Sequence, residues 1–497
     1  MAQKQIQTLA KETAIYGVSS ILGKFLNWLL VPLYTYVLTG SADYGIVANL
    51  YAWTALLLVI LTYGMETGFF RFANKNKEIA NKVYGNTLIS VGFTSLIFAG
   101  LCIIFAQSIA DILGYSSHPE YIAMLGAVVA MDAFGAIPFA SLRFKSRPIK
   151  FAALKLLMIF TNILFNIFFL VVCPWLMKKA PGLIDWFYVS DYGVGYVFIA
   201  NVIQTVVVTL ALLPDVFKAE FRFDFPLLKQ ILRYSLPLLV LGIAGIMNQT
   251  VDKIIFPYLI DDPQLAKSEL GIYSACFKIS MVMMMFTQAF RYAYEPFIFA
   301  QHKDKNSKAA YADAMKFFII FSLLIFLGMV FYLDIFKFLI RSDYWDGLRV
   351  IPIVLFSYIF QGIFFNLSLW YKLSDKTMYG AWFSVVGVII TLAINIIFVP
   401  IYSYIASAWA TFACYFIMML ISYFYGQKYM PIQYNLKSIG IYTALALGLF
   451  IISLWINTPY FALNMMLKTV LLIIFVVYTV KKDLPLNRIP FIKKFVK

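Results

Sequence analysis

Several ionisable side chains lie within long apolar stretches of the sequence. A charge in such a place is costly, and it usually faces a water-filled cavity or another charge. A lysine or arginine there could hold an anionic ligand, and a carboxylate could carry a coupling ion. These residues are Lys24, Glu66, Asp132, Lys155, Asp252, Lys253, Lys278, Arg291, Glu295 and Lys468.

Lys24 lies near the middle of its apolar stretch, where a lysine has little scope to reach the membrane surface. The spacing of Gly17, Ser20, Lys24 and Asn27 places them on one helical face. We therefore expect Lys24 and Asn27 to line a substrate-binding cavity, where the ammonium group could hold a diphosphate or an acidic sugar. The alternative is that Lys24 pairs with a nearby carboxylate.

Gln288, Arg291 and Glu295 also share one helical face. The planar Arg291 guanidinium suits phosphate oxygens, so Arg291 is a second candidate for substrate binding. Arg291 and Glu295 are four residues apart and could instead neutralise each other. Lys278, on the same expected helix, is either a substrate-binding cation or a side chain that extends to the outer interface.

Asp252 and Lys253 are adjacent in the sequence, so we expect them to point in different directions and to have different partners. Lys253 is a candidate for substrate binding. Asp252 is a candidate ion-coupling carboxylate, and the coupling ion would be H⁺ or Na⁺. An equally supported alternative is a salt bridge of Asp252 that latches one conformational state.

Glu295, Glu66 and Asp132 complete the set of candidate ion-coupling carboxylates. Arg71 is close enough in sequence to pair with Glu66, which favours a structural ion pair there. Asp132 precedes Gly135 and Pro138, so its helix could break near the carboxylate. We expect Lys155 and Lys468 to lie at membrane interfaces, because both are near the ends of apolar stretches.

The sequence shows no pattern typical of catalysis. It contains no phosphate-cradling Gly-Lys-Ser/Thr loop, and its two histidines and four cysteines do not cluster. We therefore expect no metal site, no bound cofactor and no enzymatic activity.

The elements that position these side chains must be membrane helices. Hydrophobic residues make up 62% of the 497 residues, and only 13% are charged, whereas soluble domains average about 25% charged residues. A lipid-facing backbone must form its hydrogen bonds internally, which leaves helices or closed barrels. Continuous apolar runs favour helices.

We predict an all-α fold with about fourteen spans. The expected spans lie near 13–38, 44–70, 83–107, 120–141, 151–176, 193–213, 232–257, 270–299, 312–333, 347–371, 378–400, 405–426, 438–456 and 464–480.

Lysine and arginine are concentrated in alternate connections between these spans. Because cytoplasmic loops collect such residues, both termini are expected in the cytoplasm. The same asymmetry accounts for the net charge of +16 without a nucleic-acid partner. The loop containing Arg143, Lys145, Arg147 and Lys150 is expected to anchor on anionic lipid or to make the first contact with a diphosphate headgroup. No removable signal peptide is expected.

Four short matches indicate an internal repeat. Gly45 matches Gly271, Gly135 matches Gly362, Ser141 matches Ser368 and Asn166 matches Asn395, all at shifts of 226 to 229 positions. The shift maps spans 1–6 onto spans 7–12, with both halves beginning on the same side. We therefore expect a bundle at 1–218, a second bundle at 219–430, and two additional spans with a basic cytoplasmic tail at 431–497.

Several sequence segments carry a resemblance to a known family. They are Tyr16-Gly17 through Lys24 to Pro32, Tyr44-Gly45, Tyr234-Ser235-Leu236-Pro237-Leu238 with Asn248 and Asp252-Lys253, and Tyr273-Ser274-Ala275 through Lys278 to Glu295-Pro296-Phe297. Together they resemble the polysaccharide repeat-unit flippases of the Wzx type, which export units of O-antigen, lipopolysaccharide or capsule. These belong to the multidrug/oligosaccharidyl-lipid/polysaccharide exporter superfamily.

The resemblance implies two facing six-helix bundles, as in multidrug exporters of the MATE type, with spans 13 and 14 shaping a groove for a lipid tail. It implies flipping of undecaprenyl-diphosphate-linked oligosaccharides across the bacterial inner membrane by alternating access. The expected partners are this lipid-linked oligosaccharide and membrane lipids, and contacts with other polysaccharide-assembly proteins stay open.

Other functions fit parts of the same pattern. A lipid II flippase and a drug/cation antiporter share the expected fold, although an antiporter would favour an acidic cavity. A membrane glycan polymerase or lipid-linked glycosyltransferase usually has a large loop outside the membrane, for which the short connections here leave no room. A lipid-scaffolding protein would not need so many charges within its spans.

Overall fold

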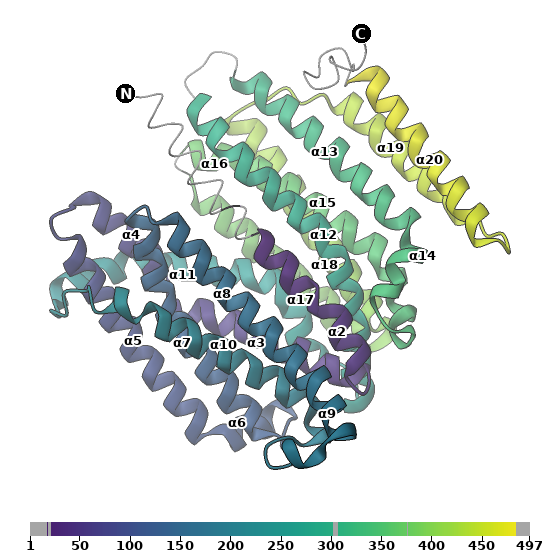
Figure 1. Ribbon diagram of the computed structural model, residues 1–497. Coiled ribbons are helices and arrows are strands. Elements are labelled where there is room, and N and C mark those ends of the chain that lie inside the picture. Colours follow the sequence, from purple (N-terminus) through teal and green to yellow (C-terminus); the bar gives the residue numbers. More distant parts are fainter. Residues whose placement is uncertain (1–16, 18–20, 302–306, 375, 484–497) are drawn as a thin grey trace, which may run out of the picture. The chain divides into compact units, whose positions relative to one another are not determined.

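The computed structural model describes residue 17 and residues 21–301, 307–374 and 376–483, without the side chains at 293, 295–301 and 307. Every regular element in these ranges is a helix (Figure 1). Thirteen of the described helices are long and apolar enough to cross a membrane, and a shorter apolar helix, Ile21–Val37, occupies the first expected span. The prediction of an all-α protein with about fourteen spans is confirmed.

The chain forms two compact units. The first contains residues 1–275 and 378–414. Its helices are α2 (Leu30–Val37), α3 (Ser41–Thr62), α4 (Met65–Lys75), α5 (Ala80–Ile104), α6 (Ala106–Leu113), α7 (Pro119–Phe144), α8 (Pro148–Ile167), α9 (Cys173–Lys179), α10 (Gly193–Val216), α11 (Phe225–Ile255), the start of α12 (Pro263–Gln301), α17 (Met378–Tyr402) and the start of α18 (Tyr404–Tyr429). Short π or 3₁₀ turns are η1 (Phe168–Val172), η2 (Pro181–Leu183), η3 (Ser190–Tyr192) and η4 (Phe256–Tyr258).

The second unit contains residues 276–377 and 415–497. It holds the remainder of α12 and α18, with α13 (Ser307–Phe331), α14 (Leu333–Phe336), α15 (Ile351–Leu367), α16 (Leu369–Leu373), α19 (Leu436–Leu454) and α20 (Phe461–Lys482). The 3₁₀ turns η5 (Lys337–Leu339) and η6 (Ser342–Val350) lead into α15. The expected division at 218 and 430 follows the sequence repeat, and it stays a prediction.

The second expected span is broken into two helices. Tyr63 and Gly64 both have positive φ angles, of 33° and 70°, and they separate α3 from α4. The left-handed conformation suits glycine, and the Tyr63 hydroxyl is fixed 2.8 Å from the Ser90 hydroxyl. This break sets the direction of α4, which carries Glu66.

A hydrogen bond and an ion pair join the start of α11 to the start of α5 within the first unit. Asp224 accepts a hydrogen bond from the Leu227 N–H at 2.9 Å and so caps α11. Its carbonyl accepts the Asn86 Nδ2 amide at 2.8 Å, and its carboxylate lies 2.6 Å from Lys82 Nζ. The start of the expected seventh span therefore contacts the third expected span through specific polar bonds.

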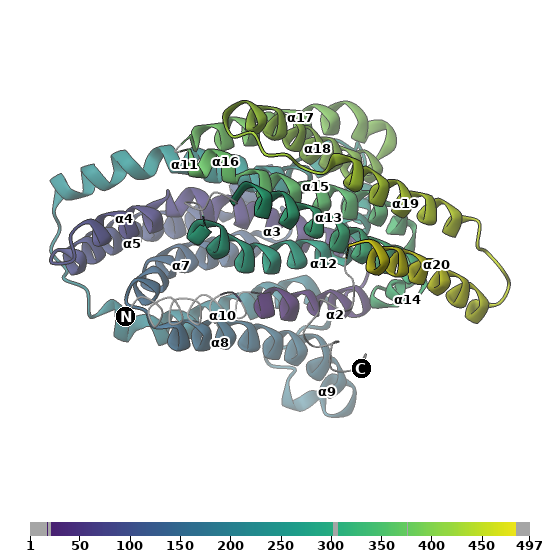
Figure 2. The same ribbon diagram turned by 90° about the horizontal axis from the view of Figure 1, so that it is seen from above.

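The two additional helices, α19 and α20, lie side by side in the second unit (Figure 2). At one end of α20, Asp483 forms an ion pair with Lys316 of α13 and accepts the Tyr442 hydroxyl of α19 at 2.7 Å. Further along α20, Lys468 Nζ lies 2.9 Å from the carboxylate of Asp334. Polar contacts at two levels therefore hold the helix pair to the rest of this unit.

Candidate functional site

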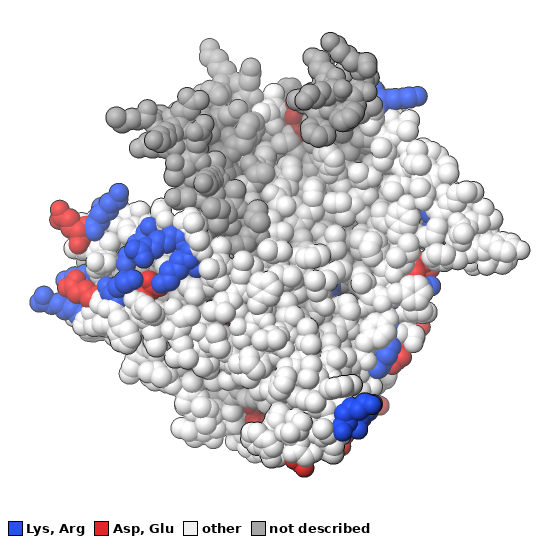
Figure 3. All heavy atoms as spheres, viewed as in Figure 1, with Lys and Arg blue, Asp and Glu red and all other residues white. Residues whose placement is uncertain are grey.

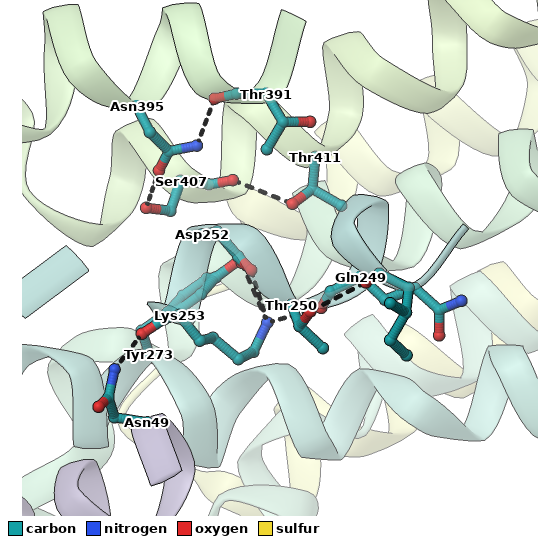
Figure 4. A network of polar contacts seen from close by, with 11 residues as sticks. Asn49, Gln249, Thr250, Asp252, Lys253, Tyr273, Thr391, Asn395, Ser407 and Thr411 are labelled. Carbon is teal, nitrogen blue, oxygen red and sulfur yellow. Dashed lines mark hydrogen bonds and ion pairs between the residues drawn. The ribbon is translucent and has the colours of Figure 1, made fainter. Parts of the chain in front are cut away.

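Among the candidate carboxylates whose side chains the structure describes, Asp252 is the most deeply buried, and it lies near the end of α11 (Figure 4). Only 3% of Asp252 is exposed. Lys253 Nζ lies 3.0 and 3.2 Å from its two carboxylate oxygens, and the Tyr273 hydroxyl of α12 donates to Oδ2 at 2.8 Å. The expectation that Asp252 and Lys253 need different partners is wrong, because the four-carbon lysine side chain folds back onto its neighbour.

Polar side chains tie this pair to other helices of the first unit. Asn49 of α3 donates to the Lys253 carbonyl at 2.7 Å and accepts the Tyr115 hydroxyl at 3.0 Å. One turn before Asp252, Asn248 donates to the Ser384 carbonyl of α17 at 2.9 Å. A change in the Asp252–Lys253 pair would therefore alter contacts of α11 with α3 and α12, next to its contact with α17.

A second polar chain joins α17 to α18 (Figure 4). The Ser407 hydroxyl donates to Asn395 Oδ1 at 2.6 Å, and Asn395 Nδ2 donates to the Thr391 carbonyl at 2.7 Å. Asn166, the repeat partner of Asn395, makes the equivalent bond to the Asn162 carbonyl at 2.8 Å. At both positions the asparagine side chain donates to the carbonyl four residues earlier in its own helix, which agrees with the internal repeat.

Asp132 also lies against a cation within the first unit. It is in electrostatic contact with Lys155 of α8 and lies beside Thr205 of α10. Lys155 Nζ is 4.1 Å from the centre of the Phe139 ring. The expectation of an interfacial Lys155 is therefore corrected, because this ammonium group packs between helices. The helix does not break, since α7 continues through Pro138.

Glu66 forms an ion pair, but with a different partner from the one expected. Its carboxylate pairs with Arg143 at the end of α7. Arg71 instead places its guanidinium 4.1 Å from the centre of the Tyr234 ring on α11. The helix break at Gly64 turns α4 so that Glu66 meets α7. The three described carboxylates proposed for ion coupling therefore each face a lysine or arginine.

The candidate substrate-binding cations lie in both units. Lys24 is half-buried and Asn27 is exposed in the first unit, whereas Lys278 is half-buried in the second. Arg291, also in the second unit, has its guanidinium 5.4 Å from the centre of the Phe365 ring. That these side chains line one cavity stays a prediction. The side chain of Glu295 lies outside the described residues, so its pairing with Arg291 is untested.

An apolar cavity of about 340 Å³ lies within the second unit. Helices α13, α15, α18 and α19 form its walls, so the first additional helix encloses it. Residues that line it include Met315, Ile319, Phe356, Phe360, Tyr423 and Ile439. Such a lining suits a hydrocarbon chain.

Comparison with family models gives one match over more than half of the chain. Residues 9–299 match the family described as polysaccharide biosynthesis protein. The chain belongs to the polysaccharide biosynthesis protein family. Residues 263–397, from the start of α12 into α17, also match the MatE family. A comparison with curated protein sequences found no significant match.

Solved structures share the fold of this polysaccharide biosynthesis family member. The lipid II flippase MurJ in an inward closed conformation has a TM-score of 0.74 at 14% identity, covering 94% of this chain and 99% of that one. An inward-facing multidrug resistance MATE family transporter has a TM-score of 0.64 at 13% identity, covering 82% of this chain and 95% of that one. These likenesses show that the chain shares the fold of these proteins, and the thirteen candidate spans among the described residues make it a multi-pass membrane protein.

Sequence reasoning missed several polar residues that this family member places at the site. Tyr273 and Asn49 complete the surroundings of Asp252 and Lys253. Asn395 and Ser407 form the neighbouring chain between α17 and α18. Asparagine within an apolar span was the available signal, since a buried amide needs hydrogen-bond partners.

Within the described residues, no group of three histidine, cysteine or carboxylate side chains could hold a metal ion.

Proposed function

We propose that this protein flips polyprenyl-diphosphate-linked oligosaccharide repeat units across the bacterial inner membrane by alternating access. The observation that carries the proposal is a polysaccharide biosynthesis family chain with cations inside its spans, at Lys24, Lys278 and Arg291. A diphosphate is tolerated away from water only when it is paired with positive charge. These cations would hold the headgroup while the polyprenyl tail remains in hydrocarbon.

The apolar cavity of the second unit supports a lipid-linked substrate. Its volume and apolar lining suit part of a polyprenyl tail, and α19 supplies one wall. The ion pairs Lys316–Asp483 and Asp334–Lys468 would keep α20, and through it α19, in place beside the cavity. None of the residues that line this cavity is charged, so the cavity suits a hydrocarbon chain better than the cationic drug of an antiporter.

Proton coupling fits the described carboxylates better than sodium coupling. Asp252, Asp132 and Glu66 each lie against a lysine or arginine of the chain. A sodium ion would have to displace that cation, whereas a proton neutralises the carboxylate and releases its partner. Asp252 is the preferred coupling residue, because it is the most buried of the three and its surroundings include several helices.

The proposed function also includes a topology and partners. Both termini are proposed to lie in the cytoplasm, and other polysaccharide-assembly proteins are proposed as partners.

Deletion of the gene followed by lipid analysis tests the proposal. We expect a complete lipid-linked repeat unit to accumulate on the cytoplasmic side of the membrane. Accumulation of exported but unpolymerised repeats would instead identify a glycan polymerase. Lys24→Ala should abolish export with normal membrane insertion, and full activity of this variant would remove Lys24 from the site. Leu22→Ala, an exposed position one half-turn away, is the matched control.

A lipid II flippase is the second candidate function. The favouring observation is that the match to MurJ covers 94% of this chain, whereas the matches to MATE transporters cover 82–85%. Such a difference would arise if MurJ, unlike these transporters, had counterparts of α19 and α20. Depletion of the protein separates the two functions. Loss of cell-wall synthesis with normal surface polysaccharide would support lipid II, and the reverse pattern would support the oligosaccharide substrate.

A further inference from the structure

The turn between α7 and α8 forms a rigid basic surface in the first unit. Lys145 N–H donates to the Ser141 carbonyl at 2.9 Å, and Arg147 N–H donates to the Leu142 carbonyl at 2.9 Å. Ser146 between them has a positive φ of 49°, and Pro148 begins α8. Because the backbone is fixed by these bonds, the exposed side chains of Lys145 and Arg147 are displayed from a defined position.

Further cations reach this surface from the end of α10. Asp215 Oδ2 lies 2.5 Å from Lys150 Nζ, and Asp215 Oδ1 lies 3.4 Å from Lys218 Nζ, so two lysines share one carboxylate. The Tyr84 hydroxyl donates to the Asp215 carbonyl at 3.1 Å, and Lys145 Nζ lies 5.4 Å from the centre of the Tyr84 ring. Lys145, Lys150 and Lys218 therefore lie around one carboxylate, and Arg147 lies close to Lys145, which leaves an excess of positive charge.

Lys145 and Arg147 carry that excess. In the described part of the chain, neither forms an ion pair. Partial desolvation, and then the positive charges of Arg147 and Lys218, lower the pKa of the Lys145 ammonium, while Asp215 acts in the opposite sense. A local positive potential that the single carboxylate of Asp215 does not balance favours an external anion.

Two apolar side chains indicate where the anion comes from. Ile149 is 76% exposed beside Arg147, and Phe217 is 74% exposed beside Lys218. Figure 3 shows lysine and arginine, with a smaller number of aspartate and glutamate side chains among them, gathered over the ends of α4 and α8, while the flanks of these helices are uncharged. Basic groups next to exposed apolar side chains at a helix end match a membrane interface, where a lipid phosphate is available.

We propose that Lys145, Arg147 and Lys218 bind the diphosphate of a polyprenyl lipid in the cytoplasmic leaflet, before the lipid enters the transport path. A diphosphate carries more than one negative charge on adjacent phosphates, which suits two cations of the α7–α8 turn and one from the end of α10 better than a phospholipid monophosphate does. This inference rests on the proposed function for its substrate. It assigns a separate surface site, distinct from the cations inside the spans.

Binding to the purified full-length protein tests this site. The protein would be reconstituted in phosphatidylcholine nanodiscs and titrated with undecaprenyl diphosphate, with phosphatidylglycerol in a parallel titration. We expect the double variant K145Q/R147Q to weaken diphosphate binding by about thirtyfold, because each of the two basic side chains contributes about 1 kcal/mol at a membrane surface. Its binding of phosphatidylglycerol should weaken by a clearly smaller factor, because a single phosphate carries less negative charge than a diphosphate.

Two double variants with the same loss of charge serve as controls. K75Q/K77Q removes exposed lysines from the end of α4, and K178Q/K179Q removes exposed lysines from the end of α9. Both should bind the diphosphate as the unchanged protein does. The conservative K145R/R147K should retain binding, which separates loss of charge from misfolding, and thermal unfolding of all variants checks their integrity.

Unchanged diphosphate binding in K145Q/R147Q would overturn the site. Equal weakening toward phosphatidylglycerol and diphosphate would overturn it as well, because the surface would then be a general anionic-lipid contact. Failure of this lipid-binding site can be distinguished from failure of the proposed flippase function. A protein that binds the diphosphate through these residues but exports no oligosaccharide in cells would retain the site and lose the flippase assignment.

Discussion

Gly45 of α3 and Gly271 of α12 face each other at a helix crossing where neither residue could carry a side chain. A Cβ atom on Gly45 would meet the Lys267 carbonyl and lie 3.1 Å from Gly271 N, and a Cβ atom on Gly271 would meet the Ser41 carbonyl and lie 3.0 Å from Gly45 N. One turn earlier, the Ser41 and Ser268 hydroxyls are 2.6 Å apart. The two glycines are repeat partners, so equivalent backbones from the two halves pack directly together.

Gly45→Ala or Gly271→Ala should therefore destabilise the protein. The added methyl group meets backbone, which cannot rotate away, so we expect a loss of about 1–3 kcal/mol and reduced export. Thermal unfolding in detergent measures the first effect, and surface polysaccharide measures the second. Gly100→Ala in α5 is the control, since a Cβ there meets nothing within 4 Å. It should be neutral or stabilising, and an equal loss at Gly100 would contradict the crossing.

Asp252→Asn should abolish export. The change leaves the Lys253 ammonium without its carboxylate in a buried site, at a cost of about 3 kcal/mol. The double variant D252N/K253Q removes both charges and should recover most of that stability. If Asp252 couples transport to protons, the double variant stays inactive despite its recovered stability. Recovery of export together with stability would show that the pair is only a structural latch.

Asp224 should contribute to stability at neutral pH through its ion pair. The Lys82 ammonium and then the Leu227 N–H hold the pKa of Asp224 below its ordinary value of 3.8. A lowered pKa in the folded state stabilises the protein above the ordinary value, and the contribution disappears as pH falls through the folded-state value. Asp224→Asn keeps the helix cap but removes the charge.

The measurement is thermal unfolding of both proteins across pH. We expect the unchanged protein to be more stable than Asp224→Asn at pH 7, with the difference shrinking only below the ordinary carboxyl pKa of 3.8. A difference that is already lost at pH 6 would mean that another group is responsible.

Reversing the Lys316–Asp483 ion pair should test the attachment of α20. Burial opposes the charge on Asp483, but the hydrogen bonds from Lys316 and Tyr442 lower its pKa below the ordinary value. Lys316→Asp alone should increase hydrogen exchange in α20, and the double variant K316D/D483K should restore protection, at least in part. Lys308→Asp, which reverses an exposed charge on the same helix, is the control. Unchanged exchange in the single variant would show that apolar packing alone holds α20.

The local features of this fold could be predicted from the sequence. The expected span at 120–141 corresponds to α7, and the expected span at 378–400 corresponds to α17. Hydropathy over one span is a local property, and helical hydrogen bonds join residues close in sequence, so neither depends on distant contacts. The repeat could also be predicted, because matching residues recur at a nearly constant shift, such as glycine at 45 and 271 and asparagine at 166 and 395.

What the tertiary structure alone decided is the pairing of charges. No sequence pattern joins Glu66 to Arg143 rather than to Arg71, places Lys155 against Asp132, or folds Lys253 back onto Asp252. Each pairing depends on which helix faces deliver both groups to one place. The sequence by itself determines membrane helices and a duplicated exporter fold, since these follow from local hydrophobicity and pattern. The partners of the buried charges follow from helix packing, because a charge in hydrocarbon takes the nearest counter-charge in space, wherever that residue lies in the chain.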